Sequence, residues 1–259
     1  MDKKRIVIKI GTSSLTYENG HVNLKRIGQL SRVICDLVNS GNEVILVSSG
    51  AVGIGVDKLN LPEKPKEISM KQAAAAVGQC MLMHIYERYF SEYSRTVGQV
   101  LLTKDVTSQD EKKQNIINTF NELLKLKVIP IVNENDTVSI DELKFGDNDY
   151  LSYIVASLTK SDMLIILTDI DGFYDKNPNE NPDAILLHTI TDLSEKIEEA
   201  AGGAGSSLGT GGMLTKVHAS RLAAEEGIIA VIANGKDPDI IYDILDGKTV
   251  GTKFLPAER

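Results

Sequence analysis

Short, mostly apolar runs alternate with longer amphipathic stretches along this chain, and that alternation limits the possible folds more than any other feature. The runs Arg5–Ile10, 43–47 and Met163–Thr168 are rich in Val, Ile and Leu, and Leu24–Asn39 places its apolar residues at helical spacing. Buried strands separated by amphipathic helices are typical of a parallel sheet covered by helices. We therefore predict an α/β fold, a three-layer αβα sandwich with a mainly parallel central sheet.

The same reasoning places the other elements. The further expected strands are 97–103, 128–132, 185–190, 228–233 and 249–254, and the further expected helices are 70–90, 112–126, 149–159, 193–200, 213–226 and 238–245. Pro130 indicates a strand end or an irregular edge in its run, because proline cannot donate a ladder hydrogen bond. No repeat or low-complexity linker divides the sequence, so we expect one domain over residues 1–259.

Charge and cysteine content narrow the partners. The chain carries 28 Lys+Arg against 36 Asp+Glu, a net charge of −8, which argues against nucleic acid as the main partner. No apolar run approaches the roughly 18 residues of a membrane helix, and the N-terminal apolar run is too short for a signal peptide. Cys35 and Cys80 lack a paired spacing and are expected to be buried thiols in a reducing compartment. We expect a cytoplasmic protein.

Four segments, 9–14, 48–55, 133–136 with 146–149, and 209–216, combine glycine or polar residues at strand ends or helix starts. Ligands of open parallel sheets bind at the carboxyl ends of the strands, so these segments should gather along one edge. Lys9 ends a buried strand beside glycine and hydroxyl residues, and Lys216 follows free amides at a helix start; both arrangements favour anion binding. The alternatives are a solvent-directed edge lysine for Lys9 and a surface hinge for 209–216.

Carboxylates and amides cluster in the third segment, 133–136 with 146–149. They could bind a ligand ammonium, a metal ion or lysine side chains, whereas helix capping explains one aspartate but not the whole set.

Several catalytic classes are disfavoured. The GxSxG match at 205–209 lacks the preceding strand that a nucleophile elbow requires, and the four histidines are scattered singly, without zinc spacing. The glycines at 50, 53 and 55 do not form a dinucleotide fingerprint, and 209–216 is not a Walker A loop. Two lysines, two glycine-rich anion seats and a carboxylate cluster instead favour phosphoryl transfer between two anions, which needs positioning and cations rather than an enzyme nucleophile.

The motifs VIKIGTS at 7–13, VSSGAV at 47–52, VNEND at 132–136, GDND at 146–149 and GTGGMLTK at 209–216 closely resemble the amino acid kinase family, in its order and spacing, and within it the members that phosphorylate glutamate. The resemblance implies ATP-dependent phosphorylation of the γ-carboxylate of L-glutamate to L-glutamyl 5-phosphate, the first step of proline biosynthesis. It also implies Mg²⁺ bound through the ATP phosphates, with no metal site of the protein's own.

The resemblance also implies roles for individual residues. The implied catalytic set is Lys9, Lys216, Asp149, Gly11 and Gly50, in which Asp149 orients the two lysines and the glycines present backbone amides. The implied glutamate-binding set is Ser49, Asp136 and Asn148, with Asp136 a partner for the substrate ammonium. The implied ATP-binding set is Lys9, Thr168, Asp169, Thr210, Gly211, Gly212, Met213, Leu214, Thr215 and Lys216. The N-terminal part of the domain would mainly bind glutamate and the C-terminal part ATP.

Many members of the resembled group continue into a PUA domain, whereas this sequence ends at Arg259, so we expect none here. A homo-oligomer, dimer or tetramer, and inhibition by proline at or near the glutamate pocket are also implied. Two alternatives stay open. One is a kinase of the same superfamily acting on acetylglutamate, aspartate, carbamate or UMP, and the other is a nucleotide-binding protein without turnover.

Overall fold

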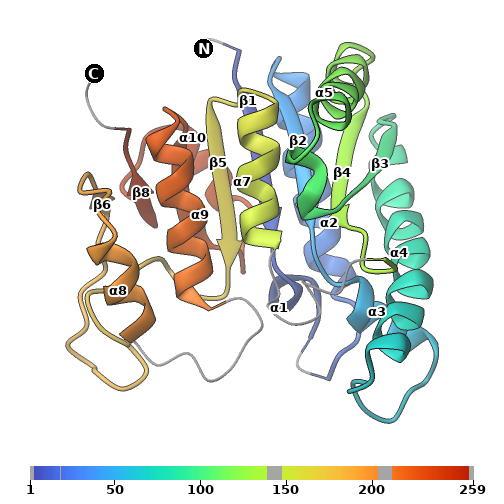
Figure 1. The fold of residues 1–259 in the computed structure, drawn as a ribbon, viewed down its shortest axis with the longest axis horizontal. Helices are drawn as coiled ribbons and strands as arrows, with labels where there is room; N and C mark the ends of the chain where they lie inside the picture. The colour runs from blue at the N-terminus through green and yellow to red at the C-terminus, as the bar shows by residue number, and fades with distance from the viewer. Residues whose placement is uncertain (1–2, 18, 139–147, 204–211, 257–259) are drawn as a thin grey trace.

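The computed structural model describes residues 3–17, 19–138, 148–203 and 212–256. Its centre is an eight-stranded sheet in the order β3-β4-β2-β1-β5-β7-β8-β6 (Figure 1). The pair of β7 and β8 is antiparallel and every other pair is parallel. The strands are β1 Arg5–Ile10, β2 Glu43–Ser48, β3 Val97–Leu102, β4 Ile129–Glu134, β5 Met163–Thr168, β6 Thr189–Ile190, β7 Ile229–Asn234 and β8 Thr252–Phe254. The mainly parallel sheet agrees with the sequence-based prediction.

Helices cover both faces of the sheet, and each layer has its own core. On one face, α2 (Leu24–Asn39), α4 (Ile68–Ser91) and α10 (Ile240–Leu245) pack against strand residues such as Ile6 and Ile8. On the other, α5 (Asp110–Lys125), α7 (Asn148–Leu158), α8 (Lys196–Gly203) and α9 (Met213–Glu225) pack with Val7 of the same strand. Alternate residues of a strand point to opposite faces, which is why apolar runs rather than alternating patterns encode β1 and β5. The three-layer sandwich is confirmed (Figure 1).

Several element boundaries differ from the predictions. The run 185–190 contributes only Thr189–Ile190 as strand, with one isolated bridge from Leu186 to Tyr174, and 249–254 contributes only Thr252–Phe254. Pro130 is the second residue of β4, and the pairing of β4 with β2 begins at Ile131. The proline therefore lies near the strand end, as expected.

Within the described residues, the structure contains three short helices that were not predicted: α1 (Thr12–Leu15), α3 (Ala51–Lys58) and the 3₁₀ turn η1 (Lys104–Thr107). Helix α3 changes the interpretation of segment 48–55, because Gly53 and Gly55 lie inside it rather than in an anion-binding loop. A Cβ on Gly55 would lie 1.8 Å from the Ala74 carbonyl oxygen of α4, and one on Gly78 would lie 1.8 Å from the Ala51 carbonyl oxygen of α3. These two glycines let the backbones of α3 and α4 touch.

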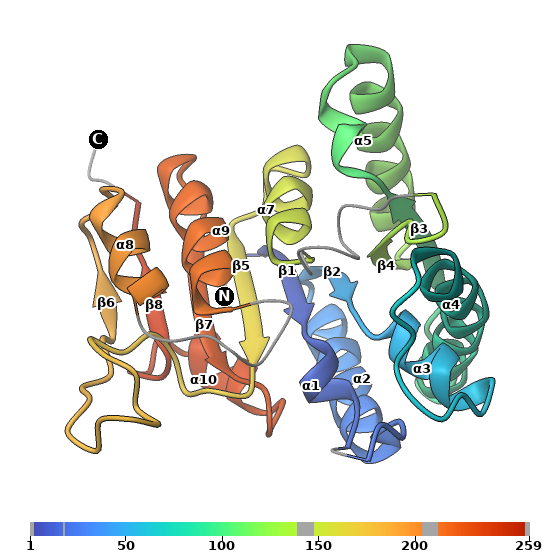
Figure 2. The same cartoon turned by 60° about the horizontal axis from the view of Figure 1, so that its bottom comes forward.

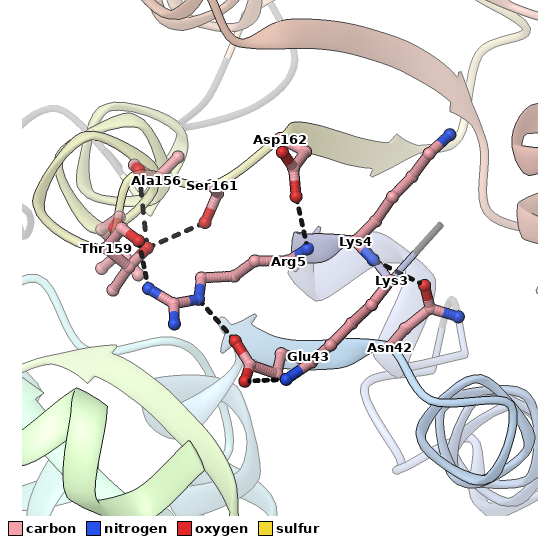
Figure 3. A network of polar contacts seen from close by, with 10 residues as sticks. Lys3, Lys4, Arg5, Asn42, Glu43, Ala156, Thr159, Ser161 and Asp162 are labelled. Atoms are coloured by element: carbon pink, nitrogen blue, oxygen red, sulfur yellow. Dashed lines mark hydrogen bonds and ion pairs between the residues drawn. The ribbon is translucent and has the colours of Figure 1, made fainter. Parts of the chain in front are cut away.

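The amino ends of the central strands are tied by a polar network, shown in Figure 3. Arg5, at the start of β1, donates from Nε to Glu43 of β2 at 2.8 Å, from Nη1 to the Thr159 carbonyl at 2.5 Å, and from its backbone N–H to Asp162 at 2.7 Å. Lys3 pairs with the other oxygen of Glu43 at 2.6 Å. Exposed ion pairs stabilise little, so this network chiefly aligns β1, β2 and β5.

Among the helices of the described ranges, none has the length and apolar character needed to cross a membrane.

Candidate active site

The opposite edge of the sheet, at the carboxyl ends of the strands, carries the polar segments that the sequence singled out. From β1 the chain first continues to β2 on one side of β1, and it later returns to place β5 on the other side. The order of the strands therefore reverses between β1 and β5, and a ligand-binding crevice is expected there. Figure 2 brings the edge forward and shows α1 and α3 following β1 and β2 there. A cavity of about 930 Å³ opens at this edge, and its lining includes Lys9, Gly11, Ser49, Gly50, Asn133, Asp136, Thr168, Asp169 and Lys216.

Two lysines from distant parts of the chain meet at one buried carboxylate beside this cavity. Asp149, in the first turn of α7, is fully buried. Lys9 Nζ, at the end of β1, lies 2.6 Å from its Oδ1, and Lys216 Nζ, on α9, lies 3.2 Å from its Oδ2. Thr215 Oγ1 also donates to Oδ2, at 2.8 Å. The carboxylate therefore fixes both ammonium groups in place, each of them almost wholly buried yet lining the cavity.

Burial and charge act against each other in this triad. Burial alone would raise the pKa of the Asp149 carboxyl, but the ammonium groups of Lys9 and Lys216 hold that pKa below its ordinary value. Burial lowers the pKa of the Lys216 ammonium, the charge of Lys9 lowers it further, and Asp149 only partly offsets them. The net positive charge of the triad, aimed at a cavity, suits a ligand that brings several negative charges.

A chain of side-chain amides runs beneath the other side of the cavity. Asn148 Nδ2, next to Asp149 in α7, donates to Ser49 Oγ at 2.8 Å and to Asn133 Oδ1 at 2.9 Å. Asn133 Nδ2 in turn donates to Gln79 Oε1 of α4 at 2.8 Å. The chain joins the ends of β2 and β4 to α4 and α7, and it contains Gln79, for which the sequence offered no signal.

Two polar atoms of this chain, Gln79 Nε2 and Asn148 Oδ1, are buried without a hydrogen-bond partner among the described residues. An unsatisfied buried polar atom costs about 1–3 kcal/mol. Such costs concentrate at functional sites, where geometry matters more than stability.

Two glycines, Gly11 and Gly50, contribute backbone to the lining of the cavity. Gly50 precedes α3 with φ 104°, a left-handed conformation that only glycine adopts without strain. Gly11 precedes α1, and a Cβ there would lie 3.6 Å from Lys9 Nζ. Both glycines line the cavity, so a ligand anion can approach their backbones closely.

A model of the amino acid kinase family matches residues 4–234 of this sequence. The chain belongs to the amino acid kinase family. It is 58% identical over 258 residues to glutamate 5-kinase of Clostridium perfringens, covering 98% of this chain and 96% of that protein. It is 52% identical over 262 residues to glutamate 5-kinase of Listeria monocytogenes serovar 1/2a, covering 100% and 95%.

Solved structures of other kinases share the fold. Carbamate kinase from Giardia lamblia bound to AMP-PNP matches with a TM-score of 0.70 at 15% identity, covering 98% of this chain and 99% of that one. UMP kinase from Ureaplasma parvum matches with a TM-score of 0.66 at 18% identity, covering 98% and 100%. At such identities the likeness establishes the shared architecture alone.

In this amino acid kinase, the residues expected to meet ATP are only partly gathered at the cavity. Thr168 ends β5, donates to Asp169 Oδ1 at 3.1 Å, and lines the cavity with Asp169 and Lys216. Met213 packs against the core, Leu214 is exposed, and Thr215 is directed to Asp149 and to the Gly212 carbonyl. Thr210 and Gly211 lie outside the described residues, as does the GxSxG match at 205–209.

The lowered pKa of Lys216 predicts the pH dependence of activity. In the free enzyme, Lys216 loses its proton as pH rises through a pKa below the ordinary lysine value of about 10.4. Since kcat/KM reports free-enzyme ionisations, kcat/KM for ATP should fall on the alkaline side with a midpoint below that value. Asp149 stays ionised well into acid, because its pKa is lowered. An alkaline midpoint of kcat/KM at or above about 10.4 would contradict the prediction that the ionisation of Lys216 controls activity.

Proposed function

We propose that this amino acid kinase transfers the γ-phosphoryl group of ATP to the γ-carboxylate of L-glutamate, giving L-glutamyl 5-phosphate for proline biosynthesis. The observation that carries the reaction type is the buried Lys9–Asp149–Lys216 triad beside the cavity. The identity of the acceptor is supported by 52–58% identity to glutamate 5-kinases over nearly the whole chain.

The triad suits a reaction between two anions. A γ-carboxylate oxygen attacks the γ-phosphorus of ATP, the bond to the bridging oxygen breaks, and ADP leaves. Charge spreads over the transferred phosphoryl group and both bridging oxygens. Lys9 and Lys216 supply fixed positive charge on that path, and Asp149 keeps the two ammonium groups from moving apart. Because the acceptor is already ionised at neutral pH, no general base is required.

Glutamate would bind on the side of β2 and β4. Asp136 is buried, lines the cavity and offers a carboxylate for the substrate ammonium. Ser49 lines the cavity, and Asn148 lies behind it as its hydrogen-bond donor. The backbones of Gly11 and Gly50 would face the anionic groups, so the N-terminal half mainly forms the acceptor site.

ATP would bind on the side of β5 and α9, where Thr168, Asp169 and Lys216 line the cavity. Within the described ranges, no three His, Cys, Asp or Glu side chains are grouped closely enough to bind a metal. Mg²⁺ is commonly bound through substrate phosphates with at most one or two carboxylates, and Asp169 is the carboxylate at hand. When bound, Mg²⁺ supplies charge neutralisation on the phosphates.

A substrate panel tests the function. Purified protein with MgATP should release ADP with glutamate much faster than with N-acetylglutamate, aspartate, carbamate or UMP, and hydroxylamine should trap the acyl phosphate formed from glutamate. Preference for another acceptor would replace glutamate in the proposal. ATP binding without acceptor-dependent ADP release would instead support a nucleotide-binding protein without turnover.

Replacing Asp136 by asparagine should chiefly weaken glutamate binding. The change keeps the size of the side chain but removes the negative charge from the proposed ammonium site. Charge-assisted hydrogen bonds contribute about 1.5–3 kcal/mol, so KM for glutamate should rise on the order of 10- to 100-fold while KM for ATP changes little. Steady-state kinetics with each substrate varied in turn would measure this. An unchanged KM for glutamate would remove Asp136 from the pocket.

Three further properties belong to the proposal. A homo-oligomer, dimer or tetramer, is supported by the outer face of α4, where Met70, Val77 and Cys80 are exposed at helical spacing; light scattering would measure its size. Proline, an amino acid with the same α-carboxylate, would compete with glutamate for the pocket. Both cysteines are free, which supports a reducing compartment such as the cytoplasm. Cys35 is buried as expected, but the expectation of burial is wrong for Cys80, which is exposed on the outer face of α4.

A further inference from the structure

The amide chain beneath the cavity ends at Gln79, a residue of α4 that is not among the described residues lining the cavity. We propose that Gln79 is a positioning residue for the acceptor site. It fixes the orientation of the Asn133 side chain and, through Asn133, that of Asn148 and Ser49. The inference rests on the proposed function, because the effect is expected on glutamate.

The polarity of the hydrogen bonds explains why a glutamine is needed. Asn133 Oδ1 accepts from Asn148 Nδ2 and from the Glu134 backbone N–H, each at 2.9 Å. Its Nδ2 must then face α4, where Gln79 Oε1 accepts at 2.8 Å. If Asn133 flipped, its amide nitrogen would face two donors. Without an acceptor at position 79, the hydrogen bond from Asn133 Nδ2 that opposes this flip is lost. Asn148 Nδ2 then has no acceptor held in a fixed position.

Folding stability does not explain the glutamine. Gln79 is more than nine-tenths buried, yet its Nε2 has no hydrogen-bond partner in the part of the chain that the structure describes. An apolar side chain of similar length would fill the same space and remove this unsatisfied donor, but it would leave Asn133 Nδ2 without its acceptor, so neither choice gains a clear advantage in stability. The glutamine is therefore better explained by the side chain that it orients than by the stability of α4.

The position of Gln79 in α4 supports the same role. The preceding residue, Gly78, contacts the Ala51 carbonyl at the start of α3, directly after Ser49 and Gly50. One turn of α4 thus contacts the backbone that follows β2 and, through Gln79, the side chain of Asn133 near the end of β4. Because both contacts are made by protein atoms alone, they lower the cost of ordering the acceptor site when glutamate binds.

The first test is Gln79→Met, which keeps length and removes the accepting oxygen. KM for glutamate should rise about tenfold, the size expected for one lost hydrogen bond. KM for ATP should stay within about twofold, and the melting temperature within about 3 °C of the unaltered protein. The matched control is Gln72→Met, which makes the same change at a partly buried residue two turns earlier in α4. It should alter neither KM. If Gln79→Met does not fold, Gln79→Leu gives the same measurement.

A double-mutant cycle with Asn133→Ala separates positioning from a general packing defect. If Gln79 acts through Asn133, adding Gln79→Met to Asn133→Ala should change KM for glutamate by less than about twofold. Independent, multiplying effects would overturn the inference, as would an unchanged KM for glutamate in Gln79→Met. An unaltered protein that does not phosphorylate glutamate would instead refute the proposed function, so the two failures are distinguishable.

Discussion

Replacing Lys216 by alanine should lower turnover on the order of 10²- to 10³-fold while leaving KM for glutamate nearly unchanged. The substitution removes one of the two cations that Asp149 holds beside the cavity. A preorganised charge of this kind mainly stabilises the transition state rather than the bound substrate. The measurement is kcat at saturating glutamate and MgATP, with KM determined for each substrate.

The matched control is Lys248→Ala, which removes an exposed lysine paired with Asp243 outside the cavity. It should leave kcat within about twofold, since surface charges of this kind contribute little. Turnover of Lys216→Ala near that of the control would show that Lys216 does not act on the transferred group.

Replacing Asp149 by asparagine should be at least as damaging and should also destabilise the fold. The amide keeps the shape but leaves two buried ammonium groups without their counter-charge. Removing one partner of a buried ion network costs about 3–5 kcal/mol, and part of this cost is avoided if a lysine releases its proton. We expect a fall in turnover on the order of 10³-fold and a free energy of unfolding lower by about 3 kcal/mol.

Denaturant unfolding without ligands, followed by kinetics at a temperature where the variant is fully folded, would separate the two effects. Asp243→Asn, in an exposed ion pair, is the control. Since the pKa of Asp149 is lowered in the folded protein, its contribution to stability is present above the ordinary aspartate pKa and is lost as pH falls through the lowered one. The stability difference between Asp149→Asn and the unaltered protein should therefore narrow in strong acid. A difference independent of pH would show that the carboxylate charge is not the cause.

The sheet was predictable because its central strands are buried on both faces, and mostly apolar runs such as those of β1 and β5 encode that burial. Helix α3 was not predictable, because Gly53 and Gly55 are poor helix formers by propensity. Their helical conformation comes from contact with α4, a tertiary effect that outweighs the local preference.

The lysines of the site were predictable for a local reason. Lys9 interrupts an apolar strand at its end, and Lys216 follows glycines at a helix start, so each position is unusual in its own segment. Asn133 belonged to a cluster at a strand end, but its part in the amide chain depends on α7. Gln79 lies in an alanine-rich helix where a polar residue is ordinary. Its partner is far away in sequence, so only the folded arrangement reveals it.

The contact between α3 and α4 restricts how this pocket could be redesigned. Because the backbones meet at Gly55 and Gly78, even one added methyl group would push Ala51 and displace the adjoining turn at Ser49 and Gly50. An engineer seeking room for a bulkier acceptor should therefore leave this helix pair alone. The rim formed by residues 60–64 borders the same cavity and is mostly exposed, so changes of side-chain size there would be tolerated without shifting the reacting groups.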